Sequence, residues 1–197
     1  MSNVNPDRMI ESERKQVVLK EEYKGMQILD IGGGGEGIIG SLYGRNVVAI
    51  DRKLSELEEA NNDAIKIVMD ACDLKFTDNL FEVATSFFTL MYMNEEEKEK
   101  CILEIKRVLK VGGILEIWDT HIPKYDGGEK DIFLLQLQVD LPNRSINTGY
   151  GVLMQAKEQN TMSIKDILIK NGFKIKECEE DNSGLFRMKC SKEPDIA

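Results

Sequence analysis

The sequence predicts one α/β domain, built on a mostly parallel sheet with helices on both faces. Its 197 residues suit a single domain, and 42 % of them are hydrophobic, enough for a sizeable core. Between residues 27 and 118, short apolar runs alternate with stretches of helical pattern, which is typical of βαβ units. A glycine-rich turn follows the first run, where the chain must bend sharply into a helix. We therefore expect residues 1–197 to form one domain.

Five buried strands account for the apolar runs, and helices connect most of them. The clearest helix spans residues 94–110, because Asn94 is a good N-cap, glutamates fill the first turn and basic residues lie near its end. Gly112 and Gly113 are expected to stop it. The predicted strands are residues 27–31, 46–51, 65–70, 81–90 and 114–118, and the two shorter helices are residues 36–42 and 54–61.

Both ends of the chain depart from this alternation. Residues 7–22 are charged with interspersed apolar positions, which predicts an N-terminal helix within residues 1–25. After the fifth strand, the segment 124–153 predicts an inserted antiparallel hairpin. Ser163 is expected to cap a helix that ends at Lys170, before a terminal antiparallel pair over residues 173–180 and 185–190. We expect the 124–153 hairpin to be separable from a ligand site at the parallel strands, and its apolar alternation suits ligand specificity, a homodimer contact or, equally, an extra strand pair that covers the core.

Composition disfavours several classes of function. The net charge of −9 argues against nucleic-acid partners, whose phosphates are bound by clustered Lys and Arg, and favours a small-molecule substrate. The four cysteines are widely spaced and the chain has a single histidine, so no metal site is expected. Free thiols, the polar N-terminus and the absence of an apolar stretch that could span a bilayer predict a cytoplasmic protein without membrane attachment.

The glycine turn reads ILDIGGGGEG over residues 28–37, and Asp51 ends the next strand, where a carboxylate can bind ribose hydroxyls. Gly32, Gly34 and Gly37 satisfy the G-x-G-x-x-G pattern of dinucleotide-binding dehydrogenases. A pyrophosphate on this loop would meet two carboxylates, one before the glycines and one within them, and like charges repel. A sulfonium cofactor would instead be attracted by these acids.

The stretch LDIGGGGEG resembles the first motif of the class I S-adenosylmethionine-dependent methyltransferases. The resemblance covers about residues 26–118, because MDACDLKF, FEVATSFFTLMYM and LKVGGILEIWD are similar to the later motifs of that family. It implies a Rossmann-like fold, S-adenosylmethionine as cofactor and methyl transfer, here to a small-molecule acceptor. One departure concerns Glu36, which stands where many members carry glycine and could face either the cofactor or solvent.

The resemblance also implies a set of cofactor-binding residues. Asp30 would lie near the methionine ammonium, Asp51 would bind the ribose, and Asp70 would meet the adenine amine. Each acid has a structural alternative, since Asp51 could cap the following helix and Asp70 could cap a loop. The whole implied set is Asp30, Gly32, Gly33, Gly34, Asp51, Arg52, Asp70, Ala71 and Ser86.

The sequence indicates less about the site that binds the methyl acceptor. His121 follows the fifth strand and is a candidate general base, although the sequence favours a packed or exposed loop histidine ahead of Pro123. Tyr92, Tyr125 and Tyr150 are candidate substrate contacts, with packing as the alternative. The Asn/Asp-Pro-Pro-aromatic signature of exocyclic-amine methyltransferases is absent, which disfavours DNA, RNA and protein-glutamine acceptors. Two other classes stay open: an NAD(P)-dependent oxidoreductase and a non-catalytic S-adenosylmethionine-binding protein.

Overall fold

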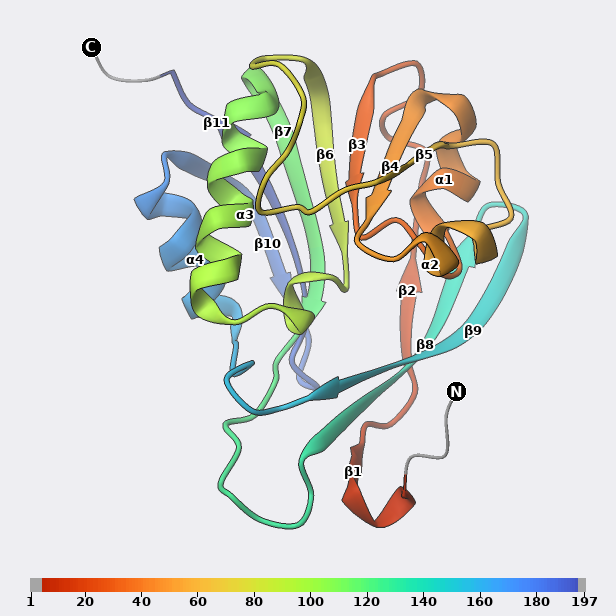
Figure 1. Cartoon of the computed structure of the whole chain (residues 1–197), viewed down its shortest axis with the longest axis vertical. Coiled ribbons are helices and arrows are strands. Elements are labelled where there is room, and N and C mark those ends of the chain that lie inside the picture. Colours follow the sequence, from red (N-terminus) through yellow and green to blue (C-terminus); the bar gives the residue numbers. More distant parts are fainter. Residues whose placement is uncertain (1–4, 195–197) are drawn as a thin grey trace.

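A seven-stranded sheet forms the centre of the computed structural model, which describes residues 5–194. The strands run in the order β10-β11-β7-β6-β3-β4-β5, and β7, β6, β3, β4 and β5 are mutually parallel (Figure 1). Strands β10 and β11 form an antiparallel pair, as predicted, and β11 joins antiparallel to β7. The strand bounds are β3 Ile28–Ile31, β4 Val47–Asp51, β5 Ile65–Val68, β6 Phe81–Phe87, β7 Leu109–Thr120, β10 Phe173–Glu180 and β11 Leu185–Lys192.

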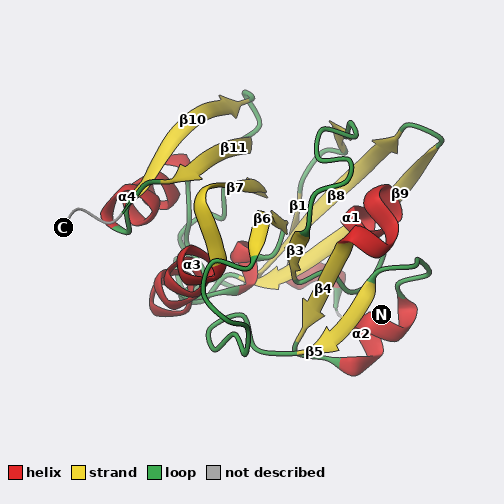
Figure 2. Ribbon diagram, turned by 90° about the horizontal axis from the view of Figure 1, so that it is seen from above, coloured by secondary structure: helices red, strands yellow, loops and turns green. Residues whose placement is uncertain are grey.

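Helices α3 (Glu95–Val108) and α4 (Thr161–Lys170) lie on one face of this sheet, and α1 (Ile38–Tyr43) lies on the other (Figure 2). Helix α3 begins with a capping box, in which Asn94 and Glu97 satisfy each other's backbone N–H groups. The short α2 (Leu54–Glu59) follows β4 and contacts β4 and β5. Three single turns complete the helices: η1 Pro6–Arg8, η2 Gly44–Asn46 and η3 Leu90–Tyr92. The mostly parallel α/β architecture predicted from the sequence is confirmed.

The inserted hairpin is also confirmed, and it belongs to a second sheet. Strands β8 (Ile132–Leu141) and β9 (Arg144–Leu153) pair antiparallel across a two-residue turn. The other edge of β8 pairs in parallel with β1 (Met9–Glu11) and then β2 (Lys15–Val18). This second sheet lies below and to the right of the main sheet in Figure 1.

The predicted N-terminal helix is therefore wrong. Along β2 the buried Lys15 and Val17 alternate with the exposed Gln16 and Val18, which is the period of a strand rather than a helix. The backbone of this segment hydrogen-bonds to the edge of β8, which lies more than a hundred residues away in the chain. This tertiary pairing overrides a local pattern that also fitted a helix.

Two cores lie on opposite faces of the main sheet. Residues of α3 and α4 pack on one face, together with alternate side chains of β3 and β6. On the opposite face, Leu135, Leu137 and Val139 of β8 are fully buried and share a core with Ile28 and Val83. Strand β8 thus covers the sheet in the way that a helix commonly does, and the hairpin is part of the domain's core rather than an appendage.

Several predicted boundaries shift by a few residues. Asn160, not Ser163, is the N-cap of α4, while Ser163 is the third residue of the helix and the partner of Asn160 in its capping box. Helix α3 ends at Val108, and β7 starts immediately after it, so Gly112 and Gly113 lie inside the strand. Strand β6 ends at Phe87, before the turn η3. Within residues 5–194, no helix is long and apolar enough to cross a membrane.

Candidate functional site

A cavity of about 430 Å³ opens at the carboxyl ends of the parallel strands, where open α/β sheets bind ligands. Its volume lies within the usual range for small-molecule sites. The glycine loop, the end of β4, the loop after β5, the segment after β6 and strand β9 all contribute to its wall. The lining residues are Gly32, Gly34, Gly35, Glu36, Ile50, Asp51, Arg52, Lys53, Glu56, Met69, Ala71, Phe87, Phe88, Thr89, Tyr92, Met93, Tyr150 and Gly151.

The glycine loop has no room for a side chain at Gly32 or Gly34. Gly32 has a φ of +70°, and a Cβ there would collide with the Thr89 side chain. At Gly34 a Cβ would lie 2.6 Å from Cβ of Glu56 and 3.0 Å from Oδ2 of Asp51. Both glycines line the cavity, as predicted for a loop that lets a ligand approach the backbone.

Asp30 and Gly33 do not line the cavity. The Asp30 carboxylate is 2 % exposed and accepts a 2.8 Å hydrogen bond from Oγ1 of Thr85. Burial raises the pKa of Asp30 to about 7, against the lowering effect of the Thr85 hydroxyl. A Cβ on Gly33 would collide with this carboxylate, so the glycine allows the acid to support the loop from below.

Asp51 ends β4 and faces the cavity. Its Oδ1 accepts a 2.9 Å hydrogen bond from the backbone N–H of Lys53, while its Oδ2 lies toward Gly34. Lys53 also pairs with Glu56 at 3.7 Å. Asp51 thus braces the segment before α2 and also lines the cavity, but it is not the helix cap considered from the sequence, because the N-cap of α2 is Lys53.

Asp70 lies behind the cavity wall rather than in it. Its Oδ1 accepts hydrogen bonds from the Cys72 N–H at 2.8 Å and from Arg52 at 3.0 Å. Partial burial opposes its ionisation, but these donors outweigh burial and lower the pKa of Asp70. Ala71 and Arg52 do line the cavity. The residues predicted for the adenine side are therefore together, with Asp70 shaping the turn that presents Ala71.

The far wall of the cavity comes from Phe87, Phe88, Tyr92 and Tyr150. The rings of Phe88 and Tyr150 are 5.9 Å apart, so β9 packs directly against the segment that follows β6. Two of the three tyrosines considered as substrate contacts, Tyr92 and Tyr150, lie in the wall. The third, Tyr125, donates to a carbonyl in its own loop and does not line the cavity.

Glu36 connects the glycine loop to the hairpin. Its carboxylate accepts hydrogen bonds from the hydroxyls of Thr148 and Tyr150, the latter at 3.1 Å. Burial and the negative charge of Glu36 raise the pKa of Tyr150. Glu36 lines the cavity, so this residue faces the ligand site and at the same time fixes β9 over it. No signal in the sequence of residues 144–153 indicated this contact.

A buried polar network supports Tyr92 from behind. Asp119 is fully buried and accepts hydrogen bonds from the Met91 N–H at 3.2 Å and from Nε2 of Gln159 at 2.6 Å. Burial raises the pKa of Asp119 to about 7, and burial lowers that of the neighbouring Lys98 to about 8. Through Met91 the network holds the turn η3, which carries Tyr92.

The two other predicted site residues lie elsewhere. Ser86 is fully buried in β6, and its hydroxyl has no hydrogen-bond partner among the described residues. His121 lines a different hollow, where Nε2 lies 3.0 Å from Oγ1 of Thr161 and 3.3 Å from Glu180. The structure therefore does not bring His121 to the cavity.

Comparison with known proteins agrees with this site. Residues 29–117, which carry the glycine loop and β3 to β7, match the model of a family described as a methyltransferase domain. Phosphoethanolamine N-methyltransferase 1 of Triticum aestivum is 34 % identical over 120 residues, which is 55 % of this chain and 24 % of that protein. The chain thus spans about a quarter of the length of this curated relative.

Solved structures share the fold over most of the chain. An S-adenosylmethionine-dependent methyltransferase from Methanosarcina mazei superposes with a TM-score of 0.61 at 20 % identity, covering 90 % of this chain and 95 % of that one. The cyclase SpnF superposes with a TM-score of 0.60 at 17 % identity, covering 87 % of this chain and 76 % of that one. Proteins with this fold therefore catalyse more than one kind of reaction, so the function of this chain has to be argued from the residues of its site.

Proposed function

We propose that this chain is a class I S-adenosylmethionine-dependent methyltransferase and that it transfers the methyl group of S-adenosylmethionine to a small-molecule acceptor. The observation that carries the proposal is the cavity itself, a space of ligand size lined by Gly32 and Gly34 of the loop and by the strand-end carboxylate of Asp51, which lies beside Gly34. When bound, the cofactor supplies an activated methyl group on a sulfonium, so the protein mainly has to align the reactants and exclude water.

The residues of the cavity fit this cofactor. We assign Oδ2 of Asp51 to the ribose hydroxyls, and Gly32 and Gly34 to the backbone that lies against the ligand. Apolar side chains, among them Ile50 and Met69, offer a dry surface for the adenine ring. Asp30 and Gly33 act by shaping the loop, and Asp70 acts by shaping the turn before Ala71.

The charge of the cavity supports a cationic ligand over a dinucleotide. Three carboxylates, from Glu36, Asp51 and Glu56, line it. Its two cations are already paired, Arg52 with Asp70 and Glu97, and Lys53 with Glu56. A pyrophosphate would find repulsion and no unpaired cation here, whereas a sulfonium and an ammonium would find attraction.

The acceptor is proposed to be a small neutral or cationic molecule, bound against the aromatic wall of Phe88, Tyr92 and Tyr150. The wheat relative is named for phosphoethanolamine, but this cavity presents no unpaired cation for a phosphate, which argues against a phosphorylated acceptor. These rings exclude water from the transfer. No histidine lines the cavity, so we propose that the acceptor attacks without a dedicated histidine base.

Formation of S-adenosylhomocysteine from S-adenosylmethionine tests the activity. The chain is incubated with a panel of small amines, phenols and thiols, with phosphoethanolamine included. We expect product with at least one unphosphorylated acceptor and none in the absence of acceptor. Tight cofactor binding with no product from any acceptor would support the non-catalytic alternative, and turnover of phosphoethanolamine alone would overturn the proposed acceptor class.

Three further proposals complete the functional assignment. The four cysteines are free thiols, which supports a cytoplasmic location. The net charge of −9 supports a small molecule rather than a nucleic acid as partner. Homodimerisation through the hairpin of residues 124–153 stays a prediction, supported by strand β9, whose ladder pairing is with β8 on one side.

A further inference from the structure

The loop between β5 and β6, residues 69–80, forms the wall of the cavity that we assign to adenine. Met69 and Ala71 line the cavity, and the loop contains no strand or helix of its own. Its first residue is held by β4, because the Met69 N–H donates to the Asp51 carbonyl. Its last residues, Asn79 and Leu80, donate to the carbonyls of the last turn of α3. Between these ends, other contacts must hold the loop in its conformation.

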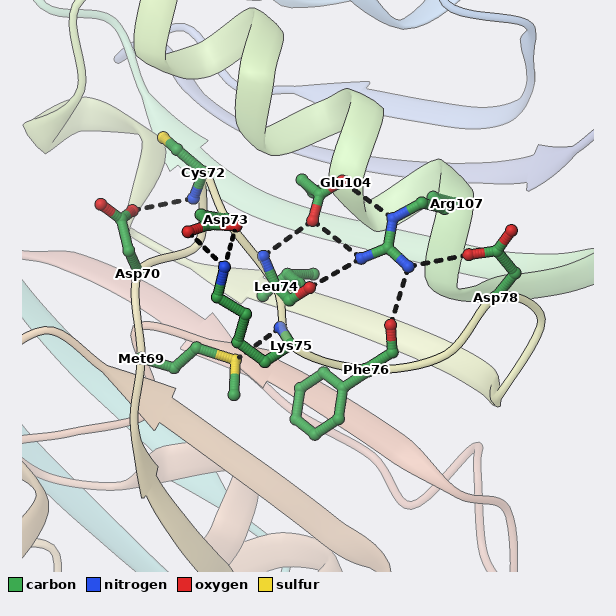
Figure 3. Close-up of polar contacts among 10 residues, drawn as sticks. All are labelled: Met69, Asp70, Cys72, Asp73, Leu74, Lys75, Phe76, Asp78, Glu104 and Arg107. Atoms are coloured by element: carbon green, nitrogen blue, oxygen red, sulfur yellow. Dashed lines mark hydrogen bonds and ion pairs between the residues drawn. The ribbon is translucent and has the colours of Figure 1, made fainter.

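Arg107 of α3 provides most of the polar contacts in this middle part (Figure 3). A guanidinium has five N–H donors, and here each has an acceptor. Nη1 donates to the Phe76 carbonyl at 2.7 Å and to Asp78 at 2.8 Å. Nη2 donates to the Leu74 carbonyl at 2.7 Å and to Glu104 at 2.8 Å, and Nε donates to Glu104 at 2.9 Å.

Glu104 closes the arrangement. While its two oxygens accept from Arg107, Oε2 also accepts a 2.7 Å hydrogen bond from the Leu74 N–H. Arg107 thus binds the carbonyls of Leu74 and Phe76, and Glu104 binds the Leu74 N–H. Both polar groups of the Leu74 backbone are therefore bound by side chains of α3. Leu74 itself is 3 % exposed, three residues after Ala71 in the cavity wall.

The opposite end of α3 holds the start of the same loop. Arg52 lies 3.0 Å from Asp70 and 3.4 Å from Glu97, in the first turn of α3. Glu97 also pairs with Lys157 at 3.4 Å. One helix therefore fixes the loop on both sides of Ala71, through Glu97 near its beginning and through Arg107 and Glu104 farther along.

We propose that Arg107 and Glu104 are positioning residues for cofactor binding, which act by holding the loop 69–80 against the adenine side of the cavity. Neither residue lines the cavity. The proposal rests on the proposed function, because it needs an adenine-bearing ligand in the site. A role limited to stability would lower the unfolding temperature and leave ligand affinity and base discrimination unchanged.

The test uses three variants of the full chain, Arg107→Lys, Glu104→Gln and Asp78→Asn, with Lys100→Ala as the matched control. Lys100 pairs with the exposed Glu96 on the same helix, and its own side chain is 57 % exposed. Calorimetric titration with S-adenosylhomocysteine is performed well below each unfolding temperature. We expect about tenfold weaker binding for the first two variants, as loss of one charged hydrogen bond suggests, and about threefold for Asp78→Asn.

Base discrimination distinguishes positioning from stability. S-Inosylhomocysteine replaces the exocyclic amine with an oxygen, and the wild-type protein is expected to bind it more weakly than S-adenosylhomocysteine. In Arg107→Lys and Glu104→Gln this preference should fall toward one, while Lys100→Ala keeps it. Folded variants with wild-type affinity and preference would overturn the proposal. If Arg107→Lys does not fold, Glu104→Gln and Asp78→Asn decide. A wild-type protein that binds neither ligand would instead refute the proposed function.

Discussion

Replacing Glu36 by alanine should detach strand β9 from the glycine loop. Glu36 accepts two hydrogen bonds from hairpin hydroxyls, those of Thr148 and Tyr150. A buried hydrogen bond to a charged group contributes about 1.5–3 kcal/mol. Since Glu36 and both partners are only partly buried, we expect about 2 kcal/mol for the pair together.

Hydrogen exchange of the β9 amides measures this loss most directly. If these amides exchange by local opening of the hairpin, 2 kcal/mol corresponds to about 30-fold faster exchange. The unfolding temperature should fall by about 4–8 °C in a chain of this size. Glu36→Gln keeps one carbonyl acceptor and should show a smaller change. Glu58→Ala, at an exposed glutamate of α2, serves as the charge control and should show none.

Unchanged exchange over residues 144–153 in a folded Glu36→Ala protein would refute this reasoning. It would mean that pairing with β8 and the contact between Phe88 and Tyr150 hold β9 without help from the carboxylate. Faster exchange elsewhere without faster exchange in the hairpin would also contradict it, because the two lost hydrogen bonds join the hairpin to the glycine loop.

Three other perturbations follow from the site. Asp51→Ala should weaken S-adenosylhomocysteine binding by about 1.5–3 kcal/mol in a folded protein, because one carboxylate oxygen faces the cavity, and calorimetry measures this. An unchanged dissociation constant would make Asp51 only a brace for α2. The pKa of Asp30, raised to about 7 by burial, predicts that the ligand-free protein loses stability as pH rises from about 4 to 7. In that window the folded state retains a proton that the unfolded state has released, so the contribution is complete below the unfolded pKa and up to about 4 kcal/mol is lost by the end. Asp30→Asn should flatten the dependence in denaturant titrations across this range, and an equally steep profile would contradict the assignment. Replacing residues 124–153 by a short loop should unfold the domain or abolish cofactor binding, because β8 supplies core residues and Tyr150 lines the cavity. A deletion variant that melts cooperatively and binds the cofactor normally would show that the hairpin is separable after all.

The parallel half of the fold could be predicted because sequence-local signals define it. Buried strands such as Ile28–Ile31 read as apolar runs, and a capping box marks the start of α3. The order of the acids along the chain predicted their common edge, since the carboxyl ends of adjacent parallel strands meet there. Of these acids, Asp51 lines the cavity, whereas Asp30 and Asp70 do not, and Ala71 lines it in place of Asp70.

The second sheet could not be predicted in the same way. Residues 15–18 form a strand only because they find the edge of β8, a contact that no local pattern contains. Lys15 is 8 % exposed, a position that a reader of the sequence would give to an apolar residue. Its ammonium is satisfied by Oγ1 of Thr120 and the Ser183 carbonyl, both distant in the chain.

The candidate site shows the same division between local and distant signals. Asp30 was expected beside the ligand, but its position inside β3 directs the carboxylate into the protein beneath Gly33. Glu36 was ambiguous, because its partners belong to β9, more than a hundred residues later. Tertiary contacts of this kind decide which of the acids in a motif face the ligand.

A calorimetric titration of the wild-type chain with S-adenosylmethionine, S-adenosylhomocysteine, NAD and NADP tests the central assignment most directly. The acid-lined cavity with its paired cations predicts one site for each of the first two ligands and no binding of either dinucleotide. Tight binding of NAD or NADP, with none of S-adenosylmethionine, would contradict the account.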